Sequence, residues 1–226
     1  LEILESNTKK LLFNGFESTA FAAASLGQVH AALLPDDTEV AVKIQYPGIH
    51  VAMESDMNLM RKASIGMPNA TIVRQSIDEV HDRLKEEVDY LLEAESTRWF
   101  RENLHVDGVM VPRIYDDWCS ERVLTIEFCQ GKHLDDWLAD NPSQALRDQV
   151  GQRLYDLFFH SVFQLRRLHA DPNPGNYLFR EDGSLALIDF GCVKTLSPRF
   201  TEVVPSLLAA YRDDKPICCI KRMVMR

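Results

Sequence analysis

Residues 169–176 read His169-Ala170-Asp171-Pro172-Asn173-Pro174-Gly175-Asn176, and residues 189–191 read Asp189-Phe190-Gly191. These two segments decide the fold because the residues between them predict a β-hairpin, with one strand on each side of an Asp-Gly turn. Pairing of the two strands would place Asn176, just before the first strand, next to Asp189, just after the second. The hairpin therefore brings an amide and a carboxylate together at its open end.

One amide oxygen and one carboxylate suit Mg²⁺, which takes few protein oxygens and leaves its other positions to phosphate and water. Asp171 and Asn176 have the D-x-x-x-x-N spacing, which brings a second carboxylate near the same point. This spacing, followed by D-F-G, matches a phosphoryl-transfer loop with its metal motif. Turn and cap roles are the competing interpretation for these Asp and Asn residues, but their order around one hairpin favours the metal site.

The segment Val40-Ala41-Val42-Lys43 predicts a strand that carries a phosphate-binding lysine. Side chains alternate along a strand, so Val40 and Val42 share the face that packs inward, while Ala41 and Lys43 share the other face. The small Ala41 leaves room for a flat base beside an ammonium group that can reach phosphate oxygens. A lone strand lysine is usually solvated, so this prediction depends on the downstream motifs.

A helix is predicted to begin at Ser76, because Ser76 and Glu79 form a capping box and apolar residues follow at helical spacing. An acidic residue on this helix would hold the strand lysine, and the sequence offers Glu86 and Glu87. Helical geometry puts Glu87 on the same side as Tyr90, and this favours Glu87 over Glu86.

Strand patterns dominate the first half of the chain and helix patterns the second half. The predicted strands are residues 28–34, 39–45, 109–113 and 122–128, and the predicted helices of the second half are 134–138 and 145–168. We therefore expect an α+β protein of two lobes, with one domain over residues 1–128 and another over residues 129–226. A ligand would bind in the cleft between the lobes.

The composition is that of an ordinary globular protein. Hydrophobic residues make up 46% of the 226 residues and charged residues 26%, which argues against disorder, collagen and coiled coils. The net charge of −9 argues against a general nucleic-acid binder, because such proteins carry a positive surplus. We expect no nucleic-acid partner.

The five cysteines are odd in number and show no C-x-x-C spacing, so neither a disulfide framework nor a zinc site is indicated. A reducing compartment is expected. No apolar run approaches the ~20 residues that a membrane-spanning helix needs. The sequence begins without Met and without a signal peptide, so we expect it to be part of a longer reading frame.

Five ordered motifs resemble the UbiB (AarF) family of atypical kinases, over roughly residues 16–212. Any one of them is weak evidence, but their common order along the chain is specific. The resemblance implies a protein-kinase-like fold, with an N-terminal lobe of antiparallel strands plus one long helix, a hinge and a mostly helical C-terminal lobe. The motifs are residues 21–30, residues 40–48, Glu87-Val88-Asp89-Tyr90, residues 169–176 and residues 189–191.

The resemblance also implies roles for individual residues. Lys43 and Glu87 would form an ion pair, Asp171 would be the catalytic carboxylate, and Asn176 and Asp189 would bind the metal. ATP and Mg²⁺ are the implied cofactors, with the adenine at a hinge over residues 127–131. The implied nucleotide-binding residues are Ala22, Ala23, Ala24, Ser25, Gly27, Gln28, Ala41, Lys43, Glu127 and Cys129.

Three departures from a protein kinase bear on the substrate. The phosphate loop is rich in alanine, and each Cβ disfavours the positive φ that glycine allows. No long activation segment and no Ala-Pro-Glu motif follow Gly191, and Ala170 replaces the arginine that would bind a phosphorylated activation loop. A peptide substrate is therefore disfavoured. The K-x-G-Q element, which precedes the alanine loop in full-length family members, is not in this sequence.

The expected function is that of an ATP-dependent phosphotransferase or ATPase. It would transfer the γ-phosphoryl group of MgATP to water or to a small acceptor, of which a lipid is one candidate, and the family resemblance links it to ubiquinone and isoprenoid lipid metabolism. The alternative is a catalytically silent nucleotide-binding scaffold for quinone-pathway enzymes. A third interpretation, a small-molecule kinase of the aminoglycoside or choline type, is disfavoured by the alanine loop and by Gln45-Tyr46-Pro47-Gly48.

The expected partners are a nucleotide and a lipid or quinone precursor. We expect a cytoplasmic protein with peripheral contact at the inner face of a membrane, on the mitochondrial matrix side in a eukaryote. The basic residues Lys221, Arg222 and Arg226 could meet anionic lipid, but three charges are few.

Overall fold

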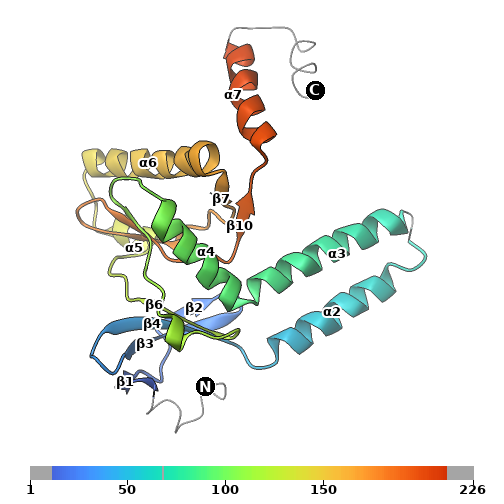
Figure 1. Cartoon of the computed structure of the whole chain (residues 1–226), viewed down its shortest axis with the longest axis horizontal. Helices are drawn as coiled ribbons and strands as arrows, with labels where there is room; N and C mark the ends of the chain where they lie inside the picture. Colours follow the sequence, from blue (N-terminus) through green and yellow to red (C-terminus); the bar gives the residue numbers. More distant parts are fainter. Residues whose placement is uncertain (1–11, 68, 213–226) are drawn as a thin grey trace.

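A five-stranded antiparallel sheet forms the N-terminal part of the computed structural model, which describes residues 12–67 and 69–212. Strand β4 lies inside this sheet between β3 and β6, while β1 and β2 both pair with β3 (Figure 1). The strands are β1 (Gly15–Phe16), β2 (Ala22–Ala24), β3 (Gly27–Leu33), β4 (Glu39–Gln45) and β6 (Val123–Glu127).

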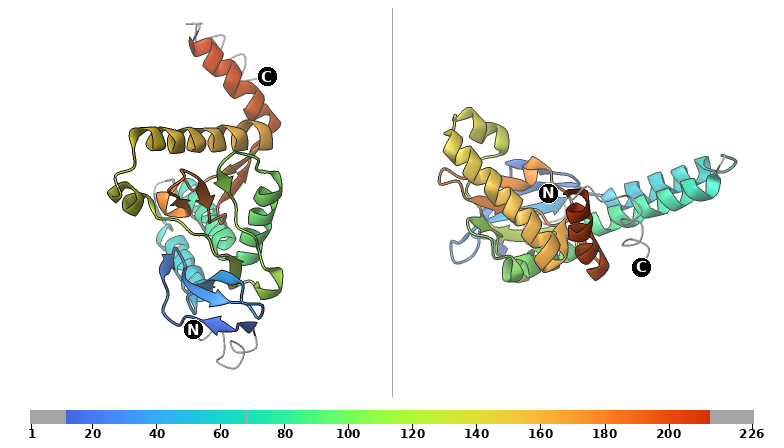
Figure 2. Two further views of the ribbon diagram at one scale, coloured as in Figure 1. Left: turned by 90° about the vertical axis from the view of Figure 1, so that its left-hand side faces the viewer. Right: turned by 90° about the horizontal axis from the view of Figure 1, so that it is seen from above.

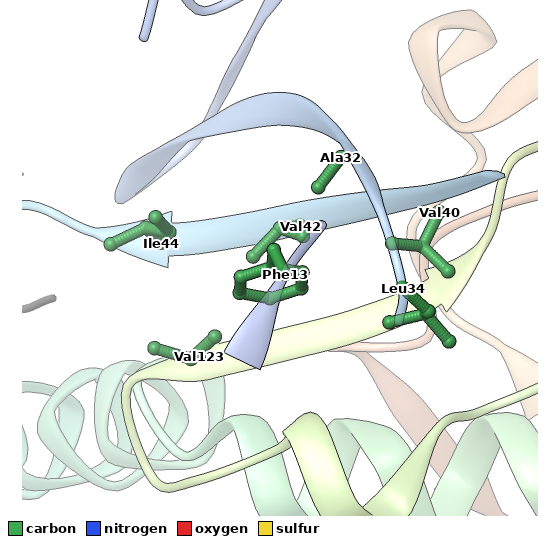
Figure 3. Close-up of a cluster of buried hydrophobic side chains, with 7 residues drawn as sticks. All are labelled: Phe13, Ala32, Leu34, Val40, Val42, Ile44 and Val123. Carbon is green, nitrogen blue, oxygen red and sulfur yellow. The ribbon is translucent and has the colours of Figure 1, made fainter. Parts of the chain in front are cut away.

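The alternation of side chains along β4 is as the sequence predicts. Val40, Val42 and Ile44 are fully buried in one hydrophobic cluster, together with Phe13 and residues of β3 and β6. Figure 3 shows Phe13 lying across the face of the sheet over these side chains. Burial of a valine or isoleucine side chain contributes roughly 1.5–3 kcal/mol, so this face anchors β4 firmly. The opposite face of β4 carries Ala41 and Lys43.

Three helices, rather than one, lie between β4 and β6. Helices α2 (Ile49–Ala63) and α3 (Ala70–Glu87) form an antiparallel hairpin, and α4 (Tyr90–Asn103) follows. Figures 1 and 2 show the α2–α3 hairpin projecting away from the rest of the molecule. The prediction of a single long helix beginning at Ser76 is therefore wrong at both ends.

The two boundaries have local physical causes. The chain becomes helical before Ser76 because the N–H groups of Ile72 and Val73 already bond to the carbonyl oxygen of Asn69. At the other end, the carboxylate of Asp89 accepts hydrogen bonds from the N–H groups of Leu91 at 3.0 Å and Leu92 at 3.3 Å. Asp89 thus caps a new helix, and the helical phase restarts there.

The second half of the chain contains the predicted hairpin. Strand β8 (Tyr177–Phe179) pairs antiparallel with β9 (Leu185–Leu187), with Tyr177 opposite Leu187. The N–H of Ile188 donates to the carbonyl oxygen of Asn176 at 3.0 Å, so pairing continues to the open end. The prediction that Asn176 and Asp189 are brought side by side is confirmed at the level of the backbone.

Helices and short strands surround this hairpin. Strand β5 pairs in parallel with β9, and β7 pairs antiparallel with β10. The remaining elements are β5 (Val109–Met110), α5 (Leu134–Ala139), α6 (Gln144–Phe159), the π-helical turn η2 (His160–Leu165), β7 (Arg167–His169), the 3₁₀ turns η1 (Asp116–Trp118) and η3 (Pro174–Asn176), β10 (Val193–Thr195) and α7 (Pro198–Arg212).

The predicted helix over residues 145–168 ends earlier than expected. Arg166 adopts a left-handed conformation with φ of 53°, which terminates the helical path. The next residues form β7, where His169 lies opposite Val193 and Leu168 opposite Lys194. Long-range pairing with β10 therefore overrides the helical pattern in this segment.

The two halves share one hydrophobic cluster across α4. Phe100 of α4 packs with Leu157 of α6, Leu187 of β9 and Phe190. Strand β5, from the first half of the sequence, pairs within the sheet of the second half. The division at residues 128 and 129 stays a prediction. None of the helices in residues 12–67 and 69–212 is both long and apolar enough to cross a membrane.

Gly27 is expected to be essential for the packing of β3 on β4. A Cβ at this position would lie 2.3 Å from the carbonyl oxygen of Ile44 and 2.9 Å from the hydroxyl of Tyr90, so the backbone would have to move. We expect Gly27→Ala to lower the free energy of unfolding by about 2 kcal/mol or more, measured by chemical denaturation.

The matched control is Gly151→Ala in α6, where a Cβ would meet nothing within 4 Å. That variant should gain about 1 kcal/mol, because alanine is the better helix former. Equal stability of the two variants would contradict the close packing inferred at Gly27.

Candidate functional site

A cavity of ≈ 560 Å³ lies between the N-terminal sheet and the β8–β9 hairpin. The sheet side of its wall includes Ala41 and Lys43 of β4, and the hairpin side includes Asn176 and Asp189. Asp171 lies in the same wall. The cavity therefore collects the side chains that the sequence motifs predicted for phosphoryl transfer.

Lys43 is the centre of an ion triad in this cavity. Its Nζ lies 3.0 and 2.8 Å from the two carboxylate oxygens of Glu93 on α4, and 3.0 Å from Oδ2 of Asp189. It also lies 4.9 Å from the centroid of the Tyr90 ring, on the same helix as Glu93. The exposed fractions of the Lys43 and Glu93 side chains are 12% and 2%, so the pair is shielded from water.

The electrostatics of the cavity favour the charged forms of Lys43 and Asp189, whereas burial raises the pKa of Glu93 above its usual range in spite of the nearby Lys43. Burial by itself would lower the pKa of Lys43, but the carboxylates of Glu93 and Asp189 raise it above its ordinary value. Burial would likewise raise the pKa of Asp189, but Lys43 and the N–H of Gly191 hold it below its usual range. The Lys43 contribution to stability is therefore present below the ordinary lysine pKa, and that of Asp189 above the ordinary aspartate pKa. Lys43 and Asp189 are therefore both charged at neutral pH.

The prediction that Glu87 pairs with Lys43 is wrong, because Glu93 occupies that place. Glu87 is the last residue of α3 and lies in the cavity wall, but α3 ends before the helix that reaches Lys43. The signal was present in the sequence. Glu93 is the one acid on the buried stripe of α4, which otherwise consists of Tyr90, Ala94, Thr97 and Phe100. Because a new helix starts after Asp89, the helical spacing counted from Ser76 does not predict which face of α4 is buried.

Asp171 and Asn176 are bonded to each other. The amide nitrogen of Asn176 donates to Oδ2 of Asp171 at 2.8 Å and to the carbonyl oxygen of Asp171 at 3.1 Å. His169 is buried, and its Nε2 lies 2.7 Å from the carbonyl oxygen of Asp189. Because that oxygen can only accept, Nε2 carries the proton. His169 therefore has a structural role and holds the backbone at Asp189.

The donor set at the hairpin end fits Mg²⁺. The amide nitrogen of Asn176 is turned toward Asp171, which leaves its Oδ1 as the atom able to bind a cation. Asp189 supplies a carboxylate in the same cavity wall. One amide oxygen and one carboxylate oxygen are hard ligands of the kind that Mg²⁺ takes alongside phosphate and water. Asn176 and Asp189 are thus the residues that would hold it.

The alanine run forms a strand of its own at one end of the cavity. Ala22, Ala23 and Ala24 make up β2, which turns tightly through Ser25 and Leu26 into β3. The three alanines and Ser25 line the cavity. Gly27 and Gln28, which the family resemblance placed at the nucleotide, follow on β3 and are not in the cavity wall.

Another part of the cavity wall lies at the predicted hinge. Glu127 and Cys129 line the cavity there, as predicted, and Phe128 lies between them. Burial raises the pKa of the Cys129 thiol to about 11, so it remains protonated and apolar in character. The ring of Phe128 lies 5.7 Å from the ring of Phe21, which precedes the alanine strand. Sequence reasoning missed this aromatic pair, because its two members are far apart in the chain.

Comparison with known proteins supports this arrangement. A family model described as "ABC1 atypical kinase-like domain" matches residues 2–220. "Atypical kinase COQ8B, mitochondrial" of Rattus norvegicus is 36% identical over 202 residues, covering 87% of this chain and 38% of that protein. "Atypical kinase COQ8, mitochondrial" of Saccharomyces cerevisiae is 30% identical over 213 residues, covering 91% and 42%. The chain thus spans less than half the length of these two relatives.

A solved structure shares the fold. The complex of Rv3197 with erythromycin from Mycobacterium tuberculosis is similar with a TM-score of 0.69 and 32% sequence identity. The match covers 81% of this chain and 47% of that one. The α+β, kinase-like fold expected from the sequence is confirmed.

Removal of the lysine should leave Glu93 as a buried charge without a cation. We expect Lys43→Met to lower the free energy of unfolding by about 3 kcal/mol at neutral pH, because breaking a buried pair on one side costs that much. In this variant the folded-state pKa of Glu93 lies above its unfolded value. The penalty should therefore be small below the ordinary glutamate pKa and grow as the pH rises. Denaturant unfolding at a series of pH values measures this.

The partner assignment is tested by two further variants. Adding Glu93→Gln to Lys43→Met should restore most of the lost stability, whereas adding Glu87→Gln should restore none. Rescue by the Glu87 change instead would show that the lysine pairs with the other carboxylate in solution.

Proposed function

The chain belongs to the family of ABC1 atypical kinase-like domains, and on this premise we propose that its cavity binds MgATP and transfers the γ-phosphoryl group to water or to a small acceptor. The observation that carries the proposal is the convergence of Lys43, Asp171, Asn176 and Asp189 in one cavity wall. Phosphoryl transfer needs little covalent chemistry from the protein, so a correctly placed set of charges is the main requirement.

Each residue has a role that its contacts support. Lys43, held by Glu93, would orient the phosphates with its ammonium group. Asp171 would position the attacking oxygen, and its own carboxylate is oriented by the amide of Asn176. Asn176 and Asp189 would hold Mg²⁺, which when bound neutralises charge on the phosphate oxygens.

The segment after the hairpin supports a small acceptor. Strand β10 begins at Val193, two residues after Gly191, and pairs at once with β7. Helix α7 begins at Pro198, with Ser197 accepting hydrogen bonds at its start. This short connection leaves little chain to form the platform on which protein kinases bind an extended peptide. Water or a small molecule is therefore the better acceptor.

The biological setting is proposed from the relatives. Those from rat and yeast carry names that place them in mitochondria and call them atypical kinases. We extend from this to a link with ubiquinone and isoprenoid lipid metabolism, with a lipid or quinone precursor as the acceptor or partner. In a eukaryote the matrix side of the inner membrane would be the site of action. The basic residues Lys221, Arg222 and Arg226, which the sequence suggested for contact with anionic lipid, lie outside the described residues.

A second candidate is a nucleotide-binding scaffold without turnover. One observation favours it: Oδ2 of Asp189 already accepts a hydrogen bond from the ammonium group of Lys43 at 3.0 Å, so the proposed metal ligand is engaged by a cation of the protein in this conformation. In a scaffold, nucleotide binding would change the shape of the cavity walls and so the recruitment of partner enzymes. Wild-type protein that binds ATP without releasing phosphate would favour this candidate.

Substitutions of Asp189 and Asp171 should have different effects on ATP binding and on phosphate release. We expect Asp189→Asn to abolish Mg²⁺-dependent ATP binding, measured by calorimetry, because it removes a metal ligand. Asp171→Asn should keep that binding and lower phosphate release roughly a hundredfold or more, because the attacking oxygen loses its positioning group. The exposed Asp56→Asn on α2 is the control and should behave as wild type. Wild-type turnover by Asp171→Asn would exclude the proposed role of that carboxylate.

The aromatic pair of Phe21 and Phe128 should contribute to binding of the adenine base of ATP and not to binding of its phosphates. Phe21→Ala removes one ring of the pair that borders the hinge end of the cavity, so we expect ATP affinity to fall about tenfold. Affinity for inorganic tripolyphosphate, which has no base, should stay the same. Phe200→Ala, an exposed phenylalanine on α7, is the control. An equal loss for both ligands would mean that Phe21 acts through the phosphate loop.

A further inference from the structure

Tyr90, the first residue of α4, lies directly behind the lysine of the cavity. Its side chain is 1% exposed and packs in a cluster with Ala94, Ile114 and Leu124. The face of its ring is turned to the ammonium group of Lys43, whose Nζ is 4.9 Å from the ring centroid. The tyrosine ring therefore supports the lysine from the side away from the cavity.

The hydroxyl group of Tyr90 is buried and has no hydrogen-bond partner among residues 12–67 and 69–212. Native proteins pair the large majority of buried polar side-chain atoms, because an unpaired one loses its bonds to water without compensation. Burial raises the pKa of Tyr90 above its ordinary value and outweighs the opposite effect of Lys43. The hydroxyl therefore keeps its proton at neutral pH and is a donor without an acceptor in this conformation.

The hydroxyl lies against Gly27, at the end of the turn between β2 and β3. A Cβ on Gly27 would be 2.9 Å from the hydroxyl oxygen. The turn consists of Ser25 and Leu26, and it joins Ala24 to Gly27, which are paired across the two strands. Ala24 and Ser25 line the cavity. The turn is therefore in contact with the cavity through Ser25 and with the hydroxyl through Gly27.

Of the two segments beside the hydroxyl, the turn is the one that is free to shift. Strand β4 lies between β3 and β6, and its Val40, Val42 and Ile44 are fully buried on the opposite face. Strand β2 has three residues and pairs with β3 alone, and Ser25 is exposed. A small movement of the turn can thus bring one of its backbone oxygens to the hydroxyl without disturbing β4.

Other polar side chains buried near this point are paired. The hydroxyl of Thr97, one helical stripe position further along α4, donates to the carbonyl oxygen of Glu93 at 2.7 Å. Gln45, which lies opposite Gly27 in the sheet, donates to the carbonyl oxygen of Val88. A phenylalanine would fill the same apolar cluster as Tyr90 without burying an unpaired oxygen. A purely structural role therefore does not account for the hydroxyl group.

We propose that Tyr90 is a positioning residue for phosphate binding, and that its hydroxyl donates to a backbone oxygen of the Ser25–Leu26 turn when phosphates occupy the cavity. This role rests on the proposed function, because MgATP brings the phosphates. A ligand shifts a conformational equilibrium only when the two states differ in their interaction free energy. The new hydrogen bond is such a difference, since it replaces an unpaired donor of the free state. Tyr90 would thereby couple the turn, through its hydroxyl, to Lys43, through its ring.

The test compares Tyr90→Phe with wild type by calorimetry, using MgATP, magnesium tripolyphosphate and adenosine. We expect the Kd values for MgATP and tripolyphosphate to rise about fivefold, because the bound state loses one hydrogen bond. The Kd for adenosine, which has no phosphate, should stay the same. Phosphate release at saturating MgATP should also be unchanged, so that KM rises while kcat does not. Tyr155→Phe, at an exposed tyrosine on α6, is the matched control and should behave as wild type.

Hydrogen exchange measures the movement of the turn directly. In wild type, tripolyphosphate should slow the exchange of the backbone amides of residues 22–28, because the hydroxyl then holds the turn. In Tyr90→Phe the same ligand, at the same fractional occupancy, should slow these amides less.

Stability without ligand separates this role from a structural one. Tyr90→Phe should unfold at the wild-type free energy or at a higher one in chemical denaturation, because no hydrogen bond is lost in the free state. A lower free energy would show that the hydroxyl already has a partner, such as an ordered water, and would overturn the proposal. Wild-type Kd values for both phosphate ligands in Tyr90→Phe would overturn it as well, and would leave the proposed function intact. Wild-type protein that binds neither phosphate ligand would contradict the proposed function and the role of Tyr90 together.

Discussion

The contact of Lys43 with two carboxylates is the constraint on which the rest of the structure depends. Glu93 comes from α4 and Asp189 from the end of the β8–β9 hairpin, so one ammonium group joins the N-terminal sheet, the helix behind it and the second half of the chain. A buried charge is tolerated only when it is paired. The hydrophobic packing of Phe100 on Phe190 and Leu187 also holds α4 against the end of the β8–β9 hairpin. The cavity walls are thus positioned by the residues that would do the chemistry.

Close packing at the turn between β2 and β3 explains how an alanine run can border the cavity. The three alanines are paired in register with β3, from Ala22 opposite Val29 to Ala24 opposite Gly27. Backbone groups that pair in a ladder are not free to turn toward phosphates, as those of a glycine loop are. The side chains of the three alanines and of Ser25 therefore form this part of the cavity wall. If the cavity binds a nucleotide as proposed, a loop of this kind would hold it in one fixed posture rather than the adaptable one of a protein kinase.

The α2–α3 hairpin is inserted between the strand that carries Lys43 and the helix that carries Glu93. Gln45, two residues after Lys43, donates to the carbonyl oxygens of Val88 and, at 3.3 Å, Glu121, and its own Oε1 lies 3.1 Å from His50. Gln45 thus ties both ends of the hairpin to the sheet. The α2–α3 hairpin and the ion pair at its base consequently belong to one continuous piece of structure.

The sequence alone determined what depends on local pattern: the alternation along β4, the β8–β9 hairpin that brings Asn176 to Asp189, and the ordered motifs of the family. Tertiary structure decided what depends on competition between distant segments. Pairing with β10 ended the helix before Arg167, the cap at Asp89 shifted the phase of α4, and Glu93 rather than Glu87 met the lysine. The physical reason is that helical periodicity does not reveal where one helix stops and the next begins, and a single broken phase turns a different side chain toward the core.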